Sequence, residues 1–583
     1  MHSTKSILVG STLVLATMIA ALPTYYAGLL ALAGIHAIVC LGLSFLLAAG
    51  QLSLGHAAFL GTGAYAAAIL TRDAGWPPLL ALAAAVAGCA ALACLLGHLT
   101  LRLRGHYLPL ATLAWGMAIH VCFGAATGVT GGASGLPDIP AFSLHGAVLG
   151  TRAMTALTWG VVALSFLAFC RIHRGRIGRA AAAIKSNPTM ASAFGVDVAA
   201  VKIRIFVLSA AMTALAGGLY AFYMQFLSPG SFSVGASFNL LIMVVLGGAL
   251  HPLGALLGAI AFTGLEIGAQ YLVASLLDLP GQMESMLFGA ILIAALLRWP
   301  NGLMTWVRVP RSAAAPAMEG HAVSPAGADR LPARALRVEA VEKHFGGLRA
   351  LQGVSIEIGA ARITGLIGPN GAGKSTLFNV MTAVLPATRG RITLGGEPLA
   401  RTSAQVVRQG VARTFQHVQL VAELSVLENV MLGGYIHGRA GLLAAALGRD
   451  RAEERALAAA AHAALAQVGL AAEAGRPVAE LTLGSQRLVE VARALMAHPR
   501  VLLLDEPAAG LREPEKRALV ALMRRLRDER GMAILLVEHD MDLVMGCVDY
   551  LFVLNYGELL SQGASAEVQR DPAVVAAYLG AEA

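Results

Sequence analysis

The first half of the chain consists of long apolar runs separated by short polar stretches. A bilayer core of about 30 Å requires roughly 20 apolar helical residues, and fewer where a helix is broken or re-entrant, so the runs predict an α-helical membrane domain of about 8–10 spans over residues 1–307. Several runs are short and rich in glycine, so eight spans with re-entrant pieces would fit the same pattern. The runs are Ile7–Leu22, Ala27–Ala49, Ala57–Leu70, Leu79–Leu99, Leu108–Ala125, Ala156–Cys170, Ile205–Phe226, Ser237–Leu250, Leu253–Leu276 and Met283–Leu297.

The pattern changes after a segment that is rich in alanine and proline. Residues 308–334 show no hydrophobic period, and we expect them to form a flexible linker. Over residues 335–583, short apolar runs typical of buried strands alternate with helical patterns. This alternation predicts a water-soluble α/β domain behind the membrane domain.

The distribution of charge supports this division. Residues 1–307 contain 13 basic and 6 acidic side chains, whereas the remaining 276 residues contain 28 of the 34 Asp and Glu. The net charge of +9 does not indicate a nucleic-acid partner, because no basic stripe with interleaved aromatic residues is present. The six cysteines form no CxxC pair or Cys/His cluster, so we expect them to act as small hydrophobic residues.

Basic residues of the membrane half gather in short loops, which is typical of the cytoplasmic side. The loop 171–204 contains seven basic residues and one acid, Asp197. Arg102 and Arg104 lie an even number of predicted spans earlier, and Arg298, Arg308 and Arg311 an even number later, so the three clusters fall on one side. We therefore expect a multi-pass membrane protein whose soluble domain is cytoplasmic.

A phosphate-binding loop follows a predicted strand at the start of the soluble domain. The strand-like ITGLIG leads into GPNGAGKST, which matches the Walker A pattern, and then into a helix expected to start near Thr376. Backbone N–H groups of such a loop wrap the phosphates of ATP, Lys374 reaches the β- and γ-phosphates, and Ser375 offers a hydroxyl to Mg²⁺. The predicted nucleotide-binding residues are Gly368, Pro369, Asn370, Gly371, Ala372, Gly373, Lys374, Ser375 and Thr376.

Two further strands end in residues that suit phosphoryl transfer to water. VLLLDEP ends in Asp505, which a buried strand delivers to Mg²⁺, and in Glu506, which is placed to act as general base toward the attacking water. AILLVEHD ends near His539, whose imidazole can hydrogen-bond the γ-phosphate. An isolated histidine is usually structural, but its place after the other two motifs favours a catalytic role.

These motifs, with Gln416 in ARTFQ, resemble in order and spacing the ATPases of ABC transporters, over about Leu336 to Gly580. The resemblance implies that Gln416 contacts Mg²⁺ and the water and reports to a permease, and that Phe345 stacks on adenine. It also implies a helical subdomain, roughly Val418 to His498, with a signature motif that covers the ATP of a partner ATPase. That motif consists of Leu481, Thr482, Leu483, Gly484, Ser485 and Gln486, and departs from the family's LSGGQ.

A narrower resemblance covers both halves. TFQHVQLVAELSVLENVMLG, DEPAAGL, VEHDMDLVMG and AYLG are similar to the ATPase of the branched-chain amino acid (Liv-type) uptake family. GQLSLGHAAFLGTGAYAAAIL, LRGHYLPLATLAWG and LRWPNGL are similar to permeases of the same family. The resemblance implies import of branched-chain or related amino acids, with a second permease, a second ATPase and a periplasmic solute-binding protein as partners.

The cytoplasmic stretch GRAAAAIKSNPTMASAFGVD, from Gly178 to Asp197, has a helical pattern that breaks at Asn187–Pro188. It is either a solvated loop or a short helix that docks on the ATPase and transmits its motion to the spans.

The family also includes importers of urea, short amides and aromatic acids, so the resemblance leaves the solute open. Two other classes compete with an importer. A non-transport ABC protein would carry two ATPase domains, whereas this chain has one behind about ten predicted spans. An ABC exporter also fuses the two halves in this order, but exporters typically have about six long helices that extend into the cytoplasm, and the runs found here are short.

Overall fold

The computed structural model of the chain describes residues 21–100, 107–144, 146–271, 282–300, 302–306 and 334–579. The first predicted span, Ile7–Leu22, lies outside the described residues except for its last two positions. The predicted linker 308–334 lies outside them except for Arg334, and so do Arg102 and Arg104.

The chain divides into two compact units that do not follow the order of the sequence. The membrane unit comprises residues 1–174, 199–310 and 445–447. The ATPase unit comprises residues 175–198, 311–444 and 448–583. The cytoplasmic segment Gly175–Val198 of the membrane half therefore packs with the soluble half.

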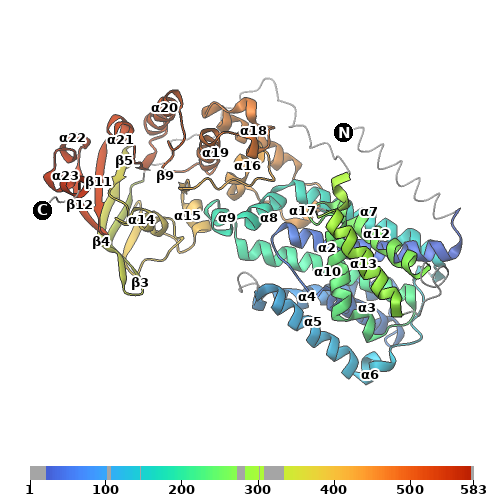
Figure 1. The fold of residues 1–583 in the computed structure, drawn as a ribbon. Helices are drawn as coiled ribbons and strands as arrows, with labels where there is room; N and C mark the ends of the chain where they lie inside the picture. The colour runs from blue at the N-terminus through green and yellow to red at the C-terminus, as the bar shows by residue number, and fades with distance from the viewer. Residues whose placement is uncertain are drawn as a thin grey trace. The chain divides into compact units, whose positions relative to one another are not determined.

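Helices build the membrane unit (Figure 1). Each of the nine predicted spans after the first corresponds to a helix. Among the described residues, six helices are long and apolar enough to cross a membrane, namely α2, α4, α5, α7, α10 and α12, whereas α3 and α11 are shorter, with 17 and 14 residues. The helices are α2 (Thr24–Ala48), α3 (His56–Arg72), α4 (Pro78–Thr100), α5 (Tyr107–Ala125), α7 (Thr151–Arg174), α10 (Val198–Met224), α11 (Val234–Gly247), α12 (Pro252–Tyr271) and α13 (Gln282–Arg298).

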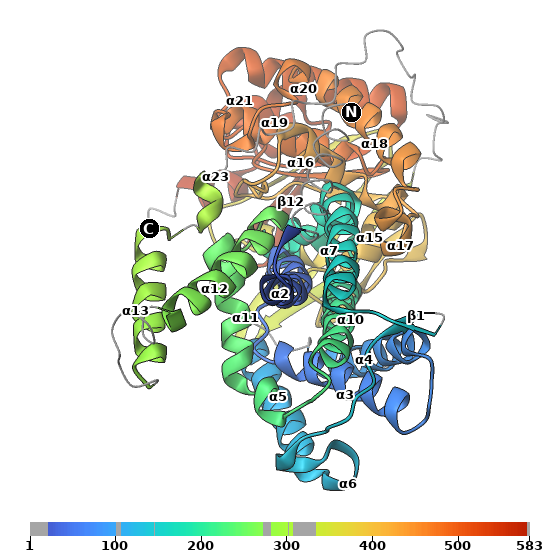
Figure 2. The ribbon, with the colours of Figure 1, turned by 90° about the vertical axis from the view of Figure 1, so that its right-hand side faces the viewer.

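Close helix crossings at glycine hold this unit together. A Cβ on Gly63 of α3 would lie 2.3 Å from the carbonyl oxygen of Ala214 in α10, and one on Gly247 of α11 would lie 1.8 Å from that of Gly254 in α12. Small residues at membrane helix interfaces let backbones approach closely and gain van der Waals contact. The central helix α2 packs against α7, α11 and α12 (Figure 2).

Two sheets form the frame of the ATPase unit. A six-stranded sheet has the order β12-β11-β5-β10-β9-β8, and its strands from β11 to β8 run parallel. A four-stranded antiparallel sheet has the order β4-β3-β6-β7. The strands are β3 (Leu336–Phe345), β4 (Leu348–Ile358), β5 (Ile363–Ile367), β6 (Arg389–Leu394), β7 (Glu397–Pro398), β8 (Val411–Arg413), β9 (Val501–Asp505), β10 (Ala533–Val537), β11 (Tyr550–Asn555) and β12 (Glu558–Gly563).

Every residue of β5, β9 and β10 is buried, as expected for parallel strands covered on both faces. Ligand sites in such sheets form outside the carboxyl ends of the strands. The three predicted motifs follow these three strands, and the strand order places β10 between β5 and β9.

Helices cover the sheets and form a separate subdomain. Helices α16, α18 and α19 enclose a core that includes Val430, Leu465 and Val489, which matches the predicted helical subdomain. The helices of the unit are α8 (Arg176–Ser186), α9 (Pro188–Ala193), α14 (Lys374–Met381), α15 (Ser403–Gln409), α16 (Val426–Gly433), α17 (Leu442–Ala446), α18 (Arg451–Gln467), α19 (Leu483–Leu495), α20 (Glu513–Arg530), α21 (Met541–Cys547), α22 (Ser565–Val568) and α23 (Pro572–Leu579).

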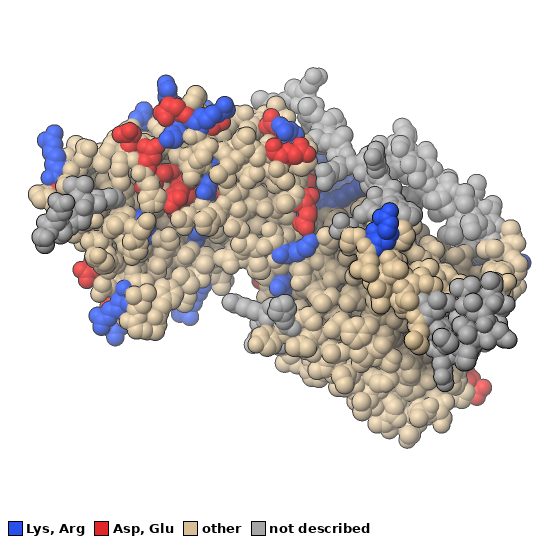
Figure 3. Space-filling view, in the orientation of Figure 1, with Lys and Arg blue, Asp and Glu red and all other residues tan. Residues whose placement is uncertain are grey.

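The predicted contrast in charge is visible on the molecular surface. On the face drawn in Figure 3, acidic and basic side chains gather over the ATPase unit, whereas the described part of the membrane unit is almost entirely uncharged. An uncharged, largely apolar surface suits a lipid environment.

Candidate nucleotide-binding site

The loop between β5 and α14 requires glycine at two positions. Gly368 has φ 149° and Gly373 has φ 97°, both in the region that side chains rarely adopt. A Cβ on Gly368 would lie 2.1 Å from the carbonyl oxygen of Leu554 in β11. Helix α14 begins at Lys374, so the prediction of a start near Thr376 was wrong by two residues. Gly373 takes the N-cap position, which brings Lys374 and Ser375 into the first turn.

The side chain of Lys374 lies inside this loop. Its Nζ donates hydrogen bonds to the carbonyl oxygens of Gly368 at 2.6 Å and Pro369 at 3.0 Å. Burial lowers the pKa of the ammonium, while Glu506 and Asp505 act against that lowering. The ammonium is thus a buried positive charge beside the N-terminus of α14, an arrangement that attracts phosphate.

A pocket of about 620 Å³ brings the separate motifs together. This volume lies within the range of small-molecule sites. Of the predicted residues, Phe345, Asn370 to Thr376, Gln416, Asp505, Glu506 and His539 line it, whereas Gly368 and Pro369 do not. Tyr556 also lines it and was not predicted.

The carboxylates after β9 differ in their surroundings. Asp505 is buried, and burial raises the pKa of its carboxyl, while nearby Arg413 acts against that rise. Glu506 has φ 47° although it is not a glycine, and its N–H donates to the carbonyl of Val537 at 2.8 Å. Such a conformation costs about 1–3 kcal/mol and is concentrated at functional sites.

Three predicted catalytic side chains meet at one oxygen atom. Gln416 Nε2 donates to Glu506 Oε1 at 3.0 Å, and His539 Nε2 lies 3.2 Å from the same oxygen. The chain thus holds the Glu506 carboxylate between an amide and an imidazole at the edge of the pocket. These two contacts fix the orientation of the Glu506 carboxylate.

The oxygen-bearing side chains of the pocket suit Mg²⁺. Ser375, Gln416 and Asp505 all line it and offer a hydroxyl, an amide and a carboxylate. Mg²⁺ binds through few protein oxygens together with phosphates, so these three side chains are a set that would hold it beside a bound phosphate.

The predicted signature motif forms the start of α19. Thr482 is the N-cap, and its Oγ1 accepts from the N–H of Ser485 at 3.3 Å. Gly484 must stay small, because a Cβ there would lie 2.9 Å from the carbonyl oxygen of Gly510. None of the six signature residues lines the chain's own nucleotide pocket.

Comparisons with known proteins cover both halves. The family model described as "Branched-chain amino acid transport system / permease component" matches residues 25–296. The model "ABC transporter" matches residues 351–509, and the model "Branched-chain amino acid ATP-binding cassette transporter" matches residues 558–583. The chain is 42% identical to the LivG protein of Salmonella typhimurium, a "High-affinity branched-chain amino acid transport ATP-binding protein", over 42% of this chain and 97% of the relative. The chain belongs to the branched-chain amino acid ABC transporter family.

Two other proteins extend the comparison. BraF of Pseudomonas aeruginosa, which has the same description as LivG, is 40% identical over 42% of this chain and 97% of BraF. A crystal structure of a nucleotide-free ATP-binding cassette from an ABC transporter is 33% identical, covers 42% of this chain and 99% of its own, and aligns with a TM-score of 0.38. Because the permease model and the ABC transporter model match successive parts of the chain, the chain is a permease–ATPase fusion: a multi-pass membrane protein with a cytoplasmic ATPase domain that hydrolyses ATP for transport.

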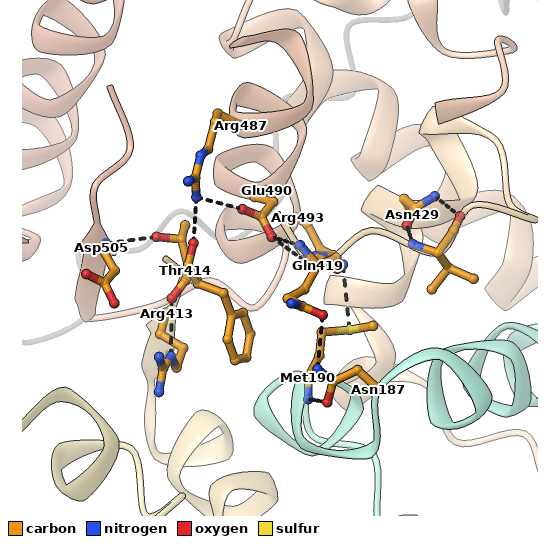
Figure 4. Close-up of polar contacts among 12 residues, drawn as sticks. Asn187, Met190, Arg413, Thr414, Gln419, Asn429, Arg487, Glu490, Arg493 and Asp505 are labelled. Carbon is orange, nitrogen blue, oxygen red and sulfur yellow. Dashed lines mark hydrogen bonds and ion pairs between the residues drawn. The ribbon is translucent and has the colours of Figure 1, made fainter. Parts of the chain in front are cut away.

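On α19 the transporter contains a buried charge network that sequence analysis missed (Figure 4). Glu490 lies 3.1 Å from Arg493 and 3.6 Å from Arg487, and all three side chains are buried. Arg487 donates to the backbone carbonyls of Phe415, at 2.6 Å, and Gln416. Arg487, Glu490 and Arg493 recur every three residues on α19, a spacing that could have indicated one charged face.

The same network reaches the cytoplasmic segment of the permease. Arg493 donates to the carbonyl of Gln419 at 2.8 Å and lies 3.6 Å from Met190 Sδ. Asn187 Nδ2 donates to Gln419 Oε1 at 3.0 Å. The loop 416–419 therefore connects the nucleotide pocket at one end to α9 at the other (Figure 4).

Arginines of α8 bind the cytoplasmic segment Gly175–Val198 to the helical subdomain. Arg179 lies 2.8 Å from Glu454. Arg176 donates to the carbonyls of Gly438 at 2.5 Å and Ala440 at 2.7 Å, with its guanidinium over the ring of Tyr435. The prediction that this segment docks on the ATPase is confirmed, and so is the break at Asn187–Pro188. The alternative of a solvated loop was wrong.

A second missed residue lies after β10. Glu538 is buried, and it accepts the N–H of Ala508 at 2.7 Å and that of His539 at 3.3 Å. Burial raises the pKa of its carboxyl, while these backbone hydrogen bonds act against that rise. Glu538 thereby links the backbone after Glu506 to the backbone of His539. Its place beside His539 in VEHD was the available signal.

Proposed function

We propose that the chain imports branched-chain or related amino acids across the bacterial inner membrane as the fused permease–ATPase subunit of an ABC importer. The observation that supports coupling most strongly is the path from Glu506 through Gln416 and Gln419 to Asn187. Relatives named for branched-chain amino acid transport support the solute class. The short helices α3 and α11 favour an importer over an exporter, whose helices extend into the cytoplasm.

In this proposal the pocket binds ATP in one orientation. Phe345 stacks on adenine, and the loop 368–376 holds the phosphates with Lys374 at the β- and γ-phosphates. Ser375, Gln416 and Asp505 hold Mg²⁺. When bound, Mg²⁺ neutralises charge on the phosphate oxygens.

Hydrolysis then depends on the residues at the pocket edge. Glu506 acts as general base and takes a proton from the attacking water. His539 donates a hydrogen bond to the γ-phosphate, and Gln416 positions the water. Because Gln416 and Gln419 belong to one short loop, a shift of Gln416 on loss of the γ-phosphate moves the contact with Asn187.

The partners in this proposal are a second permease, a second ABC ATPase and a periplasmic solute-binding protein. Residues Leu481–Gln486 would cover ATP on the partner ATPase, since they lie outside this chain's own pocket. We favour a heteromeric complex over a homodimer, because Leu483 and Ser485 depart from the family pattern and a weakened site is better tolerated beside a distinct partner.

Uptake by the reconstituted complex tests the proposal. Proteoliposomes with the ATPase outside and the binding protein inside should move labelled leucine, isoleucine or valine outward on addition of ATP and Mg²⁺. Pumping into such vesicles without any binding protein would indicate export instead. Strong solute-stimulated hydrolysis by a dimer of this chain alone would contradict the heteromeric arrangement.

A further inference from the structure

The carboxylate of Glu538 is buried directly after β10, a strand in the middle of the six-stranded sheet. Its side chain is 5% exposed, and among the described residues no basic side chain forms an ion pair with it. A carboxylate without a counter-charge is costly to bury, because water solvates its charge far better than the protein interior does. Stability of the fold alone would favour an apolar residue at this position, so we looked for what the carboxylate holds.

Each carboxylate oxygen of Glu538 accepts one backbone N–H at the edge of the nucleotide pocket. Oε1 accepts the N–H of Ala508 at 2.7 Å, and Oε2 accepts that of His539 at 3.3 Å. Ala508 is buried and lies two residues after Glu506, the proposed general base. One side chain thus joins the turn that follows the base to the histidine that faces it.

The turn that Glu538 holds begins with a strained residue. Glu506 has φ 47°, a conformation that a non-glycine residue keeps only where the surrounding structure fixes it. Two hydrogen bonds from the end of β10 fix this turn. The carbonyl of Val537 accepts the N–H of Glu506 at 2.8 Å, and Glu538 accepts that of Ala508 two residues later. Because His539 Nε2 lies 3.2 Å from Glu506 Oε1, Glu538 supports both members of this contact.

We propose that Glu538 is a positioning residue for ATP hydrolysis, which holds the turn after Glu506 and the backbone of His539 so that both side chains face the attacking water. This inference rests on the proposed function, in which Glu506 is the general base. Glu538 does not line the nucleotide pocket, so it acts through these two residues and not on ATP itself. A displacement of about 1 Å in a catalytic group can slow a reaction about 10²-fold. Loss of Glu538 should therefore lower kcat and leave the binding of ATP unchanged.

Steady-state ATP hydrolysis by the complete transporter in nanodiscs tests this role. The turnover of this chain's own site is the part that Glu506→Gln removes. Glu538→Ala should lower the kcat of that part at least tenfold, while the KM for ATP stays within twofold. Glu538→Gln should recover part of the loss, because its amide oxygen can accept the N–H of Ala508 whereas its NH₂ group cannot accept that of His539. A raised KM with an unchanged kcat in Glu538→Ala would overturn the proposal.

A double-mutant cycle separates positioning from a general loss of structure. Once Glu506→Gln has removed the base, adding Glu538→Ala should change the remaining turnover less than twofold. A further tenfold fall would show that Glu538 does not act through Glu506, and would refute the positioning role. Wild-type turnover in Glu506→Gln would instead remove the proposed base itself, so the two failures are distinguishable.

Glu428→Ala is the matched control. Glu428 also accepts a backbone N–H, that of Ser425 at 2.9 Å, and it does not line the pocket. This variant should lower the unfolding temperature, as Glu538→Ala does, but keep kcat within twofold of the wild type. An equal loss of kcat in both variants would show that hydrolysis follows stability, and would contradict the specific role of Glu538.

Discussion

Replacing Glu490 by glutamine tests whether the buried charges of α19 stabilise the ATPase unit. The Glu490 side chain is 1% exposed, pairs with Arg487 and Arg493, and accepts the N–H of Gln419 at 2.8 Å. Burial lowers the pKa of Arg493 to about 10, and the charge of Glu490 acts against that lowering. Glutamine keeps the shape of the side chain but leaves two buried guanidinium groups without a counter-charge.

The expected loss of stability follows from this geometry. Removing one partner of a buried ion pair costs about 3–5 kcal/mol. We expect about 3 kcal/mol for Glu490→Gln, because the amide oxygen can still accept the hydrogen bonds. At about 2–4 °C per kcal/mol for a domain of this size, the unfolding temperature of the ATPase unit should fall by roughly 6–12 °C.

The assay is thermal unfolding of the full chain in detergent, followed by ATPase activity after heating. Glu480→Gln is the matched control, since Glu480 is 55% exposed and lies 3.8 Å from Arg476 at the surface. An exposed pair contributes about 0–1 kcal/mol, so this variant should unfold close to the wild type. Equal unfolding temperatures for the two variants would refute the assignment of a stabilising role to the buried network.

Other variants test the pocket and the coupling segment. Glu506→Gln should bind ATP normally but hydrolyse it about 10²–10⁴-fold more slowly, and wild-type turnover in this variant would exclude Glu506 as the base. Lys374→Ala should instead weaken nucleotide binding itself, which titration with a fluorescent ATP would measure. Gly368→Ala should abolish ATP binding because its Cβ meets a backbone oxygen at 2.1 Å, whereas Gly546→Ala in helix α21, with open space around it, should bind ATP normally. Glu454→Gln removes the carboxylate that lies 2.8 Å from Arg179 and should reduce transport per ATP hydrolysed; an unchanged ratio would argue against a coupling role for that pair.

Local patterns in the sequence were sufficient to predict the architecture and most of the residues that line the pocket. Apolar runs located the nine described membrane helices that correspond to predicted spans, because lipid permits few polar residues in a spanning segment. The loop 368–376 was recognisable because its local backbone conformation requires glycine, as the φ of Gly368 shows. Asp505, Glu506 and His539 were recognisable because Asp505 ends a short, fully buried strand and the other two residues follow such strands.

The remaining features depend on contacts between distant parts of the chain. Nothing local to Glu490 indicates that its carboxylate binds the N–H of Gln419, 71 residues away. The pairing of Arg179 with Glu454 joins residues 275 apart. Tyr556 reaches the pocket only because β11 lies beside β5 in the sheet. Such pairings are set by the tertiary fold, and a single sequence shows only that charged residues are present.

The central claim is that ATP hydrolysis at Glu506 drives solute through the permease half of the same chain. The most direct test counts labelled branched-chain amino acid and released phosphate in the same proteoliposomes, with the binding protein supplied. The wild-type complex should move solute out of the vesicles in proportion to the released phosphate, and Glu506→Gln should lose both together. Continued transport against a gradient by Glu506→Gln, without phosphate release, would contradict the account.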